Sequence, residues 1–133
     1  MYKLKNELHV LLVDDDSDLL KSVKKGLTLK SNYCFDLALS ADAASEKMSQ
    51  KEYAAIVCDI QMPTMDGFEF LKKLRNKGND IPFIVFTVTD DKETALKAFR
   101  LGANGFVGKY GNPEVVFSTL IKSIEDAINN HHK

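Results

Sequence analysis

The chain has 133 residues, of which 44% are hydrophobic, so it can bury one core of ordinary size. Its 18 lysines and arginines nearly balance its 19 aspartates and glutamates, which gives a formal net charge of −1. This balance provides no general attraction to nucleic acid or to an anionic membrane, and neither is expected as a direct partner. We therefore expect a single domain over residues 1–133 whose specific electrostatics are local.

The apolar stretches are all far shorter than a membrane span, and the N-terminal residues lack the apolar segment of a signal peptide. These features predict a soluble, cytoplasmic protein. The two cysteines, Cys34 and Cys58, both lie in apolar runs typical of strands. Two thiols make no disulfide framework, and we expect both to be reduced and buried in the core.

Short apolar runs rich in Val, Ile and Phe alternate with longer segments of helical periodicity. The predicted strands are Leu8–Val13, Cys34–Leu39, Ala55–Cys58, Pro82–Val88 and Gly105–Val107. The predicted helices are Ser17–Lys30, Ala41–Lys51, Gly67–Lys77, Lys92–Leu101 and Pro113–Asn130. This alternation is typical of an α/β domain in which crossover helices join the strands of a parallel sheet.

Three consecutive aspartates, Asp14–Asp16, follow the first predicted strand directly. Carboxylates gathered at the end of a buried strand repel one another and need a compensating cation. The alternative is that Asp16 or Ser17 caps the following helix while the other carboxylates remain in water. The run by itself leaves both interpretations open.

A further aspartate, Asp59, ends the predicted strand Ala55–Cys58. In an open parallel sheet, the carboxyl ends of the strands beside the topological switch point face one crevice, so Asp14, Asp15 and Asp59 are expected to converge. Oxygen ligands without a neighbouring histidine or thiolate favour a hard cation, and a site partly open to water suits Mg²⁺ better than Ca²⁺. The sequence thus predicts a magnesium site at this edge.

Two other strand ends add groups that suit phosphoryl chemistry. Lys109 follows the fifth predicted strand and Thr87 lies at the end of the fourth, so an ammonium and a hydroxyl are expected at the same edge. A carboxylate nucleophile, a divalent cation, a lysine and a hydroxyl donor are what formation of an acyl phosphate requires. Alone, Lys109 or Thr87 would be interpreted as a surface or structural residue; together the strand ends favour a phosphorylation site.

In this order and spacing, the segments LLVDDDSD, DIQMPTMDG, FIVFT and GFVGK resemble the signature blocks of response-regulator receiver domains of two-component signalling. The resemblance covers nearly the whole chain. It implies a flavodoxin-like, doubly wound sheet of five parallel strands in the order 2-1-3-4-5 with five helices, as in the chemotaxis member of the family. It also implies a switch rather than a turnover enzyme, with a sensor histidine kinase or histidine phosphotransfer protein as donor and a downstream effector or output domain as reader.

The resemblance assigns roles to individual residues. Asp59 matches the phosphoacceptor and a magnesium ligand, Asp15 matches the direct magnesium ligand, and Asp14 matches its partner, which often acts through water. The backbone carbonyl of Gln61 matches a further magnesium ligand.

For the phosphoryl group, Lys109 matches its counter-charge and Thr87 matches a hydroxyl donor that moves on activation. Phe106 matches the aromatic switch position, whose rotamer changes with Thr87. The output face, and any dimer contact, is expected on the fourth helix, the fifth strand and the fifth helix.

The chain departs from the usual family pattern at three positions. Tyr110 replaces the proline that usually follows the lysine in a cis peptide, and a cis bond to another residue costs about 3 kcal/mol, so we expect a trans or remodelled loop. Val88 replaces a small residue, and with Gln61 it is expected to crowd the path of attacking water and slow self-dephosphorylation. Phe106 lacks a hydroxyl, so packing alone would couple it to Thr87.

Other functions fit the sequence less well. A phosphatase of the haloacid-dehalogenase type needs an acid where Gln61 stands, and a P-loop switch fails because Gly102 and Gly108 are wrongly spaced and no Ser or Thr follows Lys109. A flavin-binding domain would need a loop rich in Ser, Thr and Gly where the aspartates stand. The serious alternative is a flavodoxin-like interaction module that is not phosphorylated, against which the retained acids argue.

Overall fold

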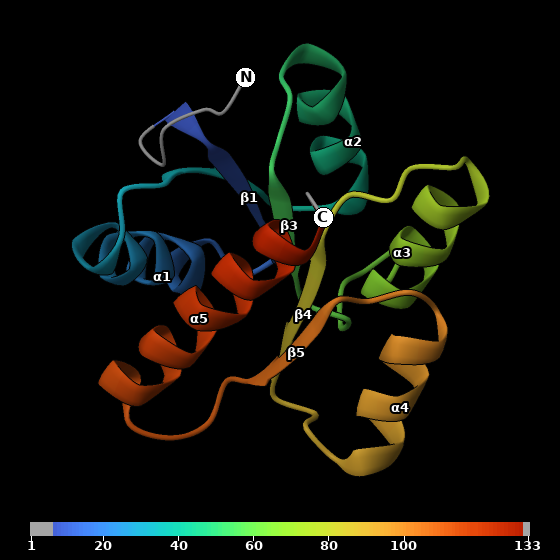
Figure 1. Cartoon of the computed structure of the whole chain (residues 1–133). Coiled ribbons are helices and arrows are strands. Elements are labelled where there is room, and N and C mark those ends of the chain that lie inside the picture. The colour runs from blue at the N-terminus through green and yellow to red at the C-terminus, as the bar shows by residue number, and fades with distance from the viewer. Residues whose placement is uncertain (1–6, 132–133) are drawn as a thin grey trace.

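The computed structural model describes residues 7–131, which form a parallel sheet with helices on both faces (Figure 1). The strands are β1 His9–Val13, β2 Cys34–Ala38, β3 Ala55–Cys58, β4 Phe83–Thr87 and β5 Gly105–Gly108. The helices are α1 Ser17–Lys30, α2 Ala41–Gln50, α3 Gly67–Asn76, α4 Lys92–Arg100 and α5 Pro113–His131. The strand order β2-β1-β3-β4-β5 confirms the order that the resemblance implies.

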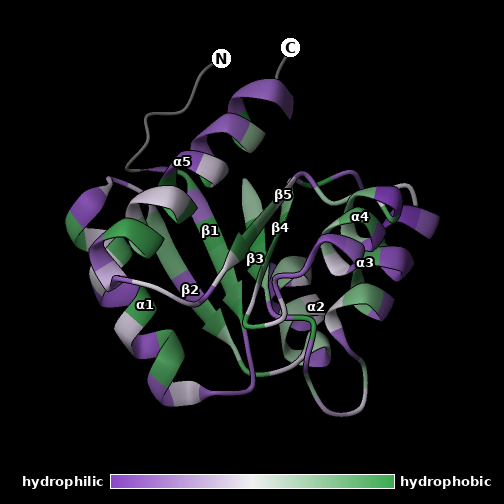
Figure 2. Ribbon diagram, turned by 90° about the horizontal axis from the view of Figure 1, so that it is seen from below, coloured by the Kyte–Doolittle hydropathy of each residue, from purple (hydrophilic) through white to green (hydrophobic). Residues whose placement is uncertain are grey.

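The core consists of two apolar clusters, one on each face of the sheet. Within β1, Val10 and Leu12 pack with residues of α1 and α5, whereas Leu11 and Val13 pack with residues of α2, α3 and α4. Because both faces are covered, the central strands are continuous apolar runs rather than alternating ones. Figure 2 shows these hydrophobic strands between helices that carry hydrophilic residues as well. None of the helices between residues 7 and 131 is long and apolar enough to span a membrane.

Side chains that precede α1 to α4 determine where these helices begin. Asp16, Ser40, Asp66 and Asp91 each accept a hydrogen bond from the backbone N–H three residues further on. At α3, Glu69 also accepts from the backbone of Asp66, which completes a capping box. The capping interpretation is therefore correct for Asp16, and it leaves the two preceding aspartates for another role.

The two cysteines differ in burial. Cys58 is fully buried, as expected, and its thiol donates to the backbone carbonyl of Asp59 at 3.1 Å. Cys34 is only partly buried, so the expectation that both thiols lie in the core is wrong for this residue. It is the first residue of the edge strand β2, in which Phe35 and Ala38 are buried and the other residues are only partly buried.

Candidate functional site

The backbone brings two of the predicted site residues together at the carboxyl edge of the sheet. Val13 and Cys58 are register partners at the ends of the neighbouring strands β1 and β3, so Asp14 and Asp59 follow them side by side. The Asp59 N–H donates to the Val13 carbonyl at 3.0 Å, and the Asp14 N–H donates to the Ala38 carbonyl at 3.1 Å. This edge is the point where the strand order reverses, which is where doubly wound sheets bind ligands.

The carboxylates of Asp14, Asp15 and Asp59 form one cluster, as the sequence led us to expect. One oxygen of each lies within 4.8 Å of the others. Taken as whole residues, Asp14 and Asp59 are 4% and 6% exposed, whereas Asp15 is exposed to solvent. A cluster of this kind could hold a metal ion, and its oxygen donors favour a hard cation.

The ammonium of Lys109 lies between the two buried carboxylates. Its Nζ is 2.6 Å from Asp14 Oδ2 and 3.1 Å from Asp59 Oδ2. Burial by itself lowers the pKa of Lys109, but the hydrogen bonds and charges of the two aspartates outweigh it, so the pKa is raised overall. The lysine is therefore held in its charged form, and it compensates part of the negative charge of the cluster.

The predicted switch residues lie on the neighbouring strands. Thr87 ends β4 and is fully buried, and its hydroxyl accepts a hydrogen bond from the Thr89 N–H at 3.2 Å. Its carbonyl accepts from the Lys109 N–H at 2.9 Å, which ties the end of β4 to the start of the β5–α5 loop. Phe106 is partly buried in β5 and packs against the cluster formed with α2, α3 and α4.

The side chain of Gln61 makes a contact that sequence reasoning did not identify. Its amide donates to Thr89 Oγ1 at 3.3 Å, which connects the β3–α3 loop to the β4–α4 loop. Its backbone N–H donates to Asp59 Oδ1, also at 3.3 Å. Thr89 lies in a loop without periodicity, so its only signal in the sequence is its position two residues after Thr87.

The loop after Lys109 has the trans geometry expected from the missing proline, since no peptide bond among the described residues is cis. Tyr110 is 72% exposed, and Gly111 has a φ of +118°, in the region that favours glycine. Asn112 directly precedes α5, and its side chain accepts from the Glu114 N–H at 2.9 Å. Val88, which with Gln61 is expected to crowd the path of attacking water, is 38% exposed.

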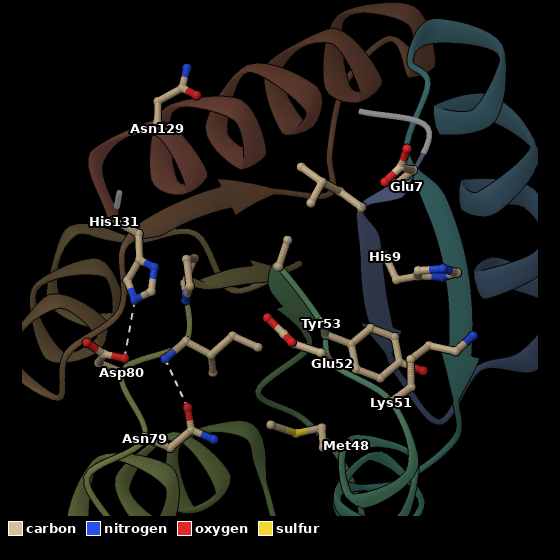
Figure 3. A pocket seen from close by; sticks show the side chains of 14 residues that line it. Glu7, His9, Met48, Lys51, Glu52, Tyr53, Asn79, Asp80, Asn129 and His131 are labelled. Atoms are coloured by element: carbon tan, nitrogen blue, oxygen red, sulfur yellow. Dashed lines mark hydrogen bonds and ion pairs between the residues drawn. The ribbon is translucent and has the colours of Figure 1, made fainter. Parts of the chain in front are cut away.

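A hollow of about 790 Å³ lies at the opposite, amino edge of the sheet (Figure 3). The Tyr53 hydroxyl and the Lys51 ammonium, both from its wall, donate to Asp36 Oδ2 at 2.6 and 3.0 Å. Across the hollow, His131 Nε2 lies 3.2 Å from Asp80 Oδ1. None of the clustered aspartates lines this hollow, so the predicted chemistry and the hollow are at different ends of the strands.

The protein-family model described as response regulator receiver domain matches residues 10–121 of this chain. The chain belongs to this family. Among curated relatives, transcriptional regulatory protein PrrA of Mycobacterium tuberculosis is 36% identical over 102 residues, which cover 75% of this chain and 42% of PrrA. Response regulator MprA of Mycobacterium leprae is 30% identical over 102 residues, 77% of this chain and 44% of MprA. The chain thus spans less than half the length of these relatives.

Solved receiver structures have the same fold. The receiver domain of the Francisella response regulator 1452 matches with a TM-score of 0.83 at 22% identity, covering 94% of this chain and 99% of that one. Chemotaxis response regulator CheY4 of Vibrio cholerae matches with a TM-score of 0.77 at 29% identity, covering 87% of this chain and 98% of that one. These likenesses confirm the flavodoxin-like fold, and the family is a signalling domain of two-component systems rather than a turnover enzyme.

Proposed function

We propose that this chain is a two-component phosphorylation switch in which Asp59 accepts a phosphoryl group from a sensor histidine kinase or a histidine phosphotransfer protein. The observation that carries the proposal is the Lys109 ammonium, held between Asp14 and Asp59 beside the exposed Asp15. The negative charge of the three carboxylates exceeds the single positive charge of Lys109. The edge is therefore suited to a divalent cation and, with it, to the oxyanions of a phosphoryl group.

Asp59 is the best candidate for the acceptor because its carboxylate makes longer hydrogen bonds than that of Asp14, the other buried aspartate. Asp14 accepts from the Asp16 N–H at 3.0 Å and from Lys109 at 2.6 Å. Asp59 has longer contacts, 3.1 Å to Lys109 and 3.3 Å to the Gln61 N–H. An oxygen of Asp59 can therefore leave its present contact and attack phosphorus at a lower cost in hydrogen bonding.

The donor set at this edge fits Mg²⁺. Asp14, Asp15 and Asp59 would supply carboxylate oxygens, and Gln61 would supply its backbone carbonyl. When bound, the ion would neutralise charge on the transferring phosphoryl oxygens.

In the proposed transfer, a carboxylate oxygen of Asp59 attacks the phosphorus of a phosphohistidine. The O–P bond forms as the P–N bond breaks, and the electron pair returns to the imidazole of the donor. Lys109 then pairs with a phosphoryl oxygen. Thr87 already accepts a hydrogen bond from Thr89, so its own O–H remains to donate to the phosphoryl group.

The proposed output surface is the face of α4, β5 and α5. Of the residues of α4, Ala98 is the one that is buried, so few apolar contacts hold this helix to the sheet. Leu96 and Phe99 of the same helix are 43% and 49% exposed, and Val115 at the start of α5 is 63% exposed. We propose that phosphorylation moves Thr87 and Phe106 and thereby changes this face for an effector, an output domain or a second copy of the chain.

We also propose that residues 1–133 form one receiver domain that acts in the cytoplasm. PrrA is named as a transcriptional regulatory protein and MprA as a response regulator, and both are more than twice as long as the matched region. An output domain or a separate effector is therefore the proposed reader of the phosphorylated state.

Intact-mass measurement after incubation with acetyl phosphate and Mg²⁺ tests the acceptor. The parent should gain the mass of one phosphoryl group, and Asp59→Asn should gain none. Asp18→Asn, which changes an exposed aspartate in the first turn of α1, is the matched control and should label like the parent. Equal labelling of parent and Asp59→Asn would place the nucleophile elsewhere, and no labelling of the parent would favour an interaction module.

Amide exchange with and without the phosphoryl mimic beryllofluoride tests the output surface. Exchange should change between residues 88 and 116, because this segment contains the β4–α4 loop, α4 and β5. The same comparison on Asp59→Asn is the control. An unchanged segment in the parent would rule out this route of signal transmission.

A further inference from the structure

The Lys109 ammonium also lies over an aromatic ring. Its Nζ is 5.7 Å from the centroid of the Phe86 ring. Phe86 is 6% exposed and the side chain of Lys109 is 11% exposed, so little water reaches the space between them. A cation at this distance is attracted by the negative face of the ring, and the attraction is stronger where water is excluded.

The ring is a neighbour of a different kind from the two carboxylates. A lysine ammonium has three N–H donors, and those of Lys109 meet Asp14 Oδ2 at 2.6 Å and Asp59 Oδ2 at 3.1 Å. Another carboxylate in the place of Phe86 would attract the ammonium as well, but it would also compete for Mg²⁺ and repel a phosphoryl group. An aromatic face attracts the ammonium without adding a full negative charge.

The loop that follows Lys109 offers its side chain little support. Tyr110 is 72% exposed, so most of its surface lies in solvent. The Lys109 backbone is tied to the Thr87 carbonyl at 2.9 Å, but a lysine side chain has a flexible four-carbon stem beyond that point. Phe86, in contrast, lies on the interior strand β4 and packs in the cluster with α1 and α5, so its ring is a fixed surface.

We propose that Phe86 is a positioning residue for phosphoryl transfer, and that its ring holds the Lys109 ammonium beside the acceptor. This inference rests on the proposed function, because it concerns the rate at which Asp59 is phosphorylated. In this role Phe86 acts through Lys109 and not on the acceptor carboxylate or the phosphoryl group.

The test compares substitutions at two phenylalanines of the same strand. Phe86→Leu and Phe86→Met remove the ring and should slow phosphorylation by acetyl phosphate and Mg²⁺ by roughly 2- to 30-fold. Phe86→Tyr keeps the ring and should restore the parent rate to within about 2-fold. The control is Phe83→Leu, which removes a fully buried ring from the opposite cluster and should lower stability without slowing phosphorylation.

A spectroscopic measurement separates positioning from a general loss of packing. In protein with isotope-labelled lysine, the Lys109 ε-methylene protons should be shifted upfield by the Phe86 ring; Lys109→Arg identifies the resonance because it removes it. The upfield shift should disappear in Phe86→Leu and Phe86→Met and persist in Phe86→Tyr and Phe83→Leu.

The outcomes distinguish this inference from the function on which it rests. If the parent is phosphorylated but Phe86→Leu and Phe86→Met react at the parent rate, the ring has no positioning role. The inference is also overturned if Phe83→Leu slows the reaction as much as Phe86→Leu, or if Phe86→Tyr keeps the upfield shift but not the rate. An unphosphorylated parent would instead overturn the proposed function itself, and this inference with it.

Discussion

The carboxyl edge of the sheet places three carboxylates around one ammonium, that of Lys109. Beside the hollow at the amino edge, the carboxylate of Asp36, in the middle of β2, accepts from Tyr53 at 2.6 Å and from Lys51 at 3.0 Å, and His9 Nδ1 lies 3.9 Å away. The hollow lies at the amino edge, but the carboxylate of Asp36 beside it is already compensated by its neighbours. An excess of negative charge, rather than the size of a hollow, therefore distinguishes the proposed phosphorylation site.

The two edges also differ in how far water screens their charges. The side chains of Asp14 and Asp59 are 5% and 8% exposed, whereas that of Asp36 is 27% exposed and that of Lys51 is 43% exposed. Ion pairs shielded from water interact much more strongly than exposed ones, and removing one partner of a buried pair leaves an uncompensated charge. Substitutions at the carboxyl edge should therefore have the larger effects.

Removing one aspartate from the carboxyl edge should have the largest effect, which is on the affinity for Mg²⁺. Asp15→Ala should abolish binding of Mg²⁺, because a hard cation with few protein ligands loses one of its carboxylates. Titration with Mg²⁺, followed by a spectroscopic or calorimetric signal, measures this. Asp36→Asn, at the other edge, should leave the affinity unchanged, and an unchanged titration of Asp15→Ala would remove the metal assignment.

Removing the lysine from each edge compares their stabilities directly. Lys109→Met leaves Asp14 and Asp59 buried without their cation, and in Mg²⁺-free buffer it should lower the free energy of unfolding by about 3–5 kcal/mol. Lys51→Met should cost less than about 1 kcal/mol because its ion pair is exposed. Urea denaturation measures both free energies of unfolding. Added Mg²⁺ should narrow the difference from the parent for Lys109→Met but not for Lys51→Met. Equal losses in the two variants would contradict the comparison.

Opening the path to the acceptor should have a moderate effect on rates. Val88→Ala should raise phosphorylation by acetyl phosphate and hydrolysis of the phosphorylated form together, on the order of tenfold or less, because both need access to the same phosphorus. Val115→Ala, on the exposed start of α5, is the control. If neither rate changes, the Gln61–Thr89 contact across the two loops becomes the better candidate for the barrier, and Thr89→Ala would test it.

The pH dependence of the amino edge should be the smallest effect. Burial alone raises the pKa of Asp36, but hydrogen bonds from Tyr53 and Lys51 outweigh it and lower the pKa below its ordinary value of 3.8. A carboxyl with a lowered pKa in the folded state contributes stability above its unfolded pKa and loses it as pH falls through the folded pKa. The stability difference between parent and Asp36→Asn should therefore be constant near neutral pH and shrink below pH of about 4. A difference that stays constant down to pH of about 2 would contradict this.

Much of the fold follows from local features of the chain. The helix predicted at Ser17–Lys30 has the same bounds in the structure, because its apolar periodicity and the Asp16 cap are both local. The predicted strand Pro82–Val88 is shorter in the structure, Phe83–Thr87, since apolar residues alone do not show where strand pairing ends. Element ends are decided by hydrogen-bond partners on other strands.

The convergence of Asp14 and Asp59 could also be predicted, because parallel strands bring their carboxyl ends to one edge whatever side chains they carry. What the sequence by itself determined is therefore the set of elements and the side chains at the strand ends. The partial burial of Cys34 could not be derived, since it depends on how far other segments of the folded chain cover the start of β2.

Only the tertiary structure decided which side chains touch within that edge. Lys109 contacts Asp14, 95 residues away in the chain, and lies over Phe86, while Gln61 reaches Thr89 from another loop. Periodicity and capping are properties of neighbouring residues, and they place a residue on an element or in a loop. The direction of a long side chain depends instead on the atoms that surround it, and these come from segments that the folded backbone alone brings together.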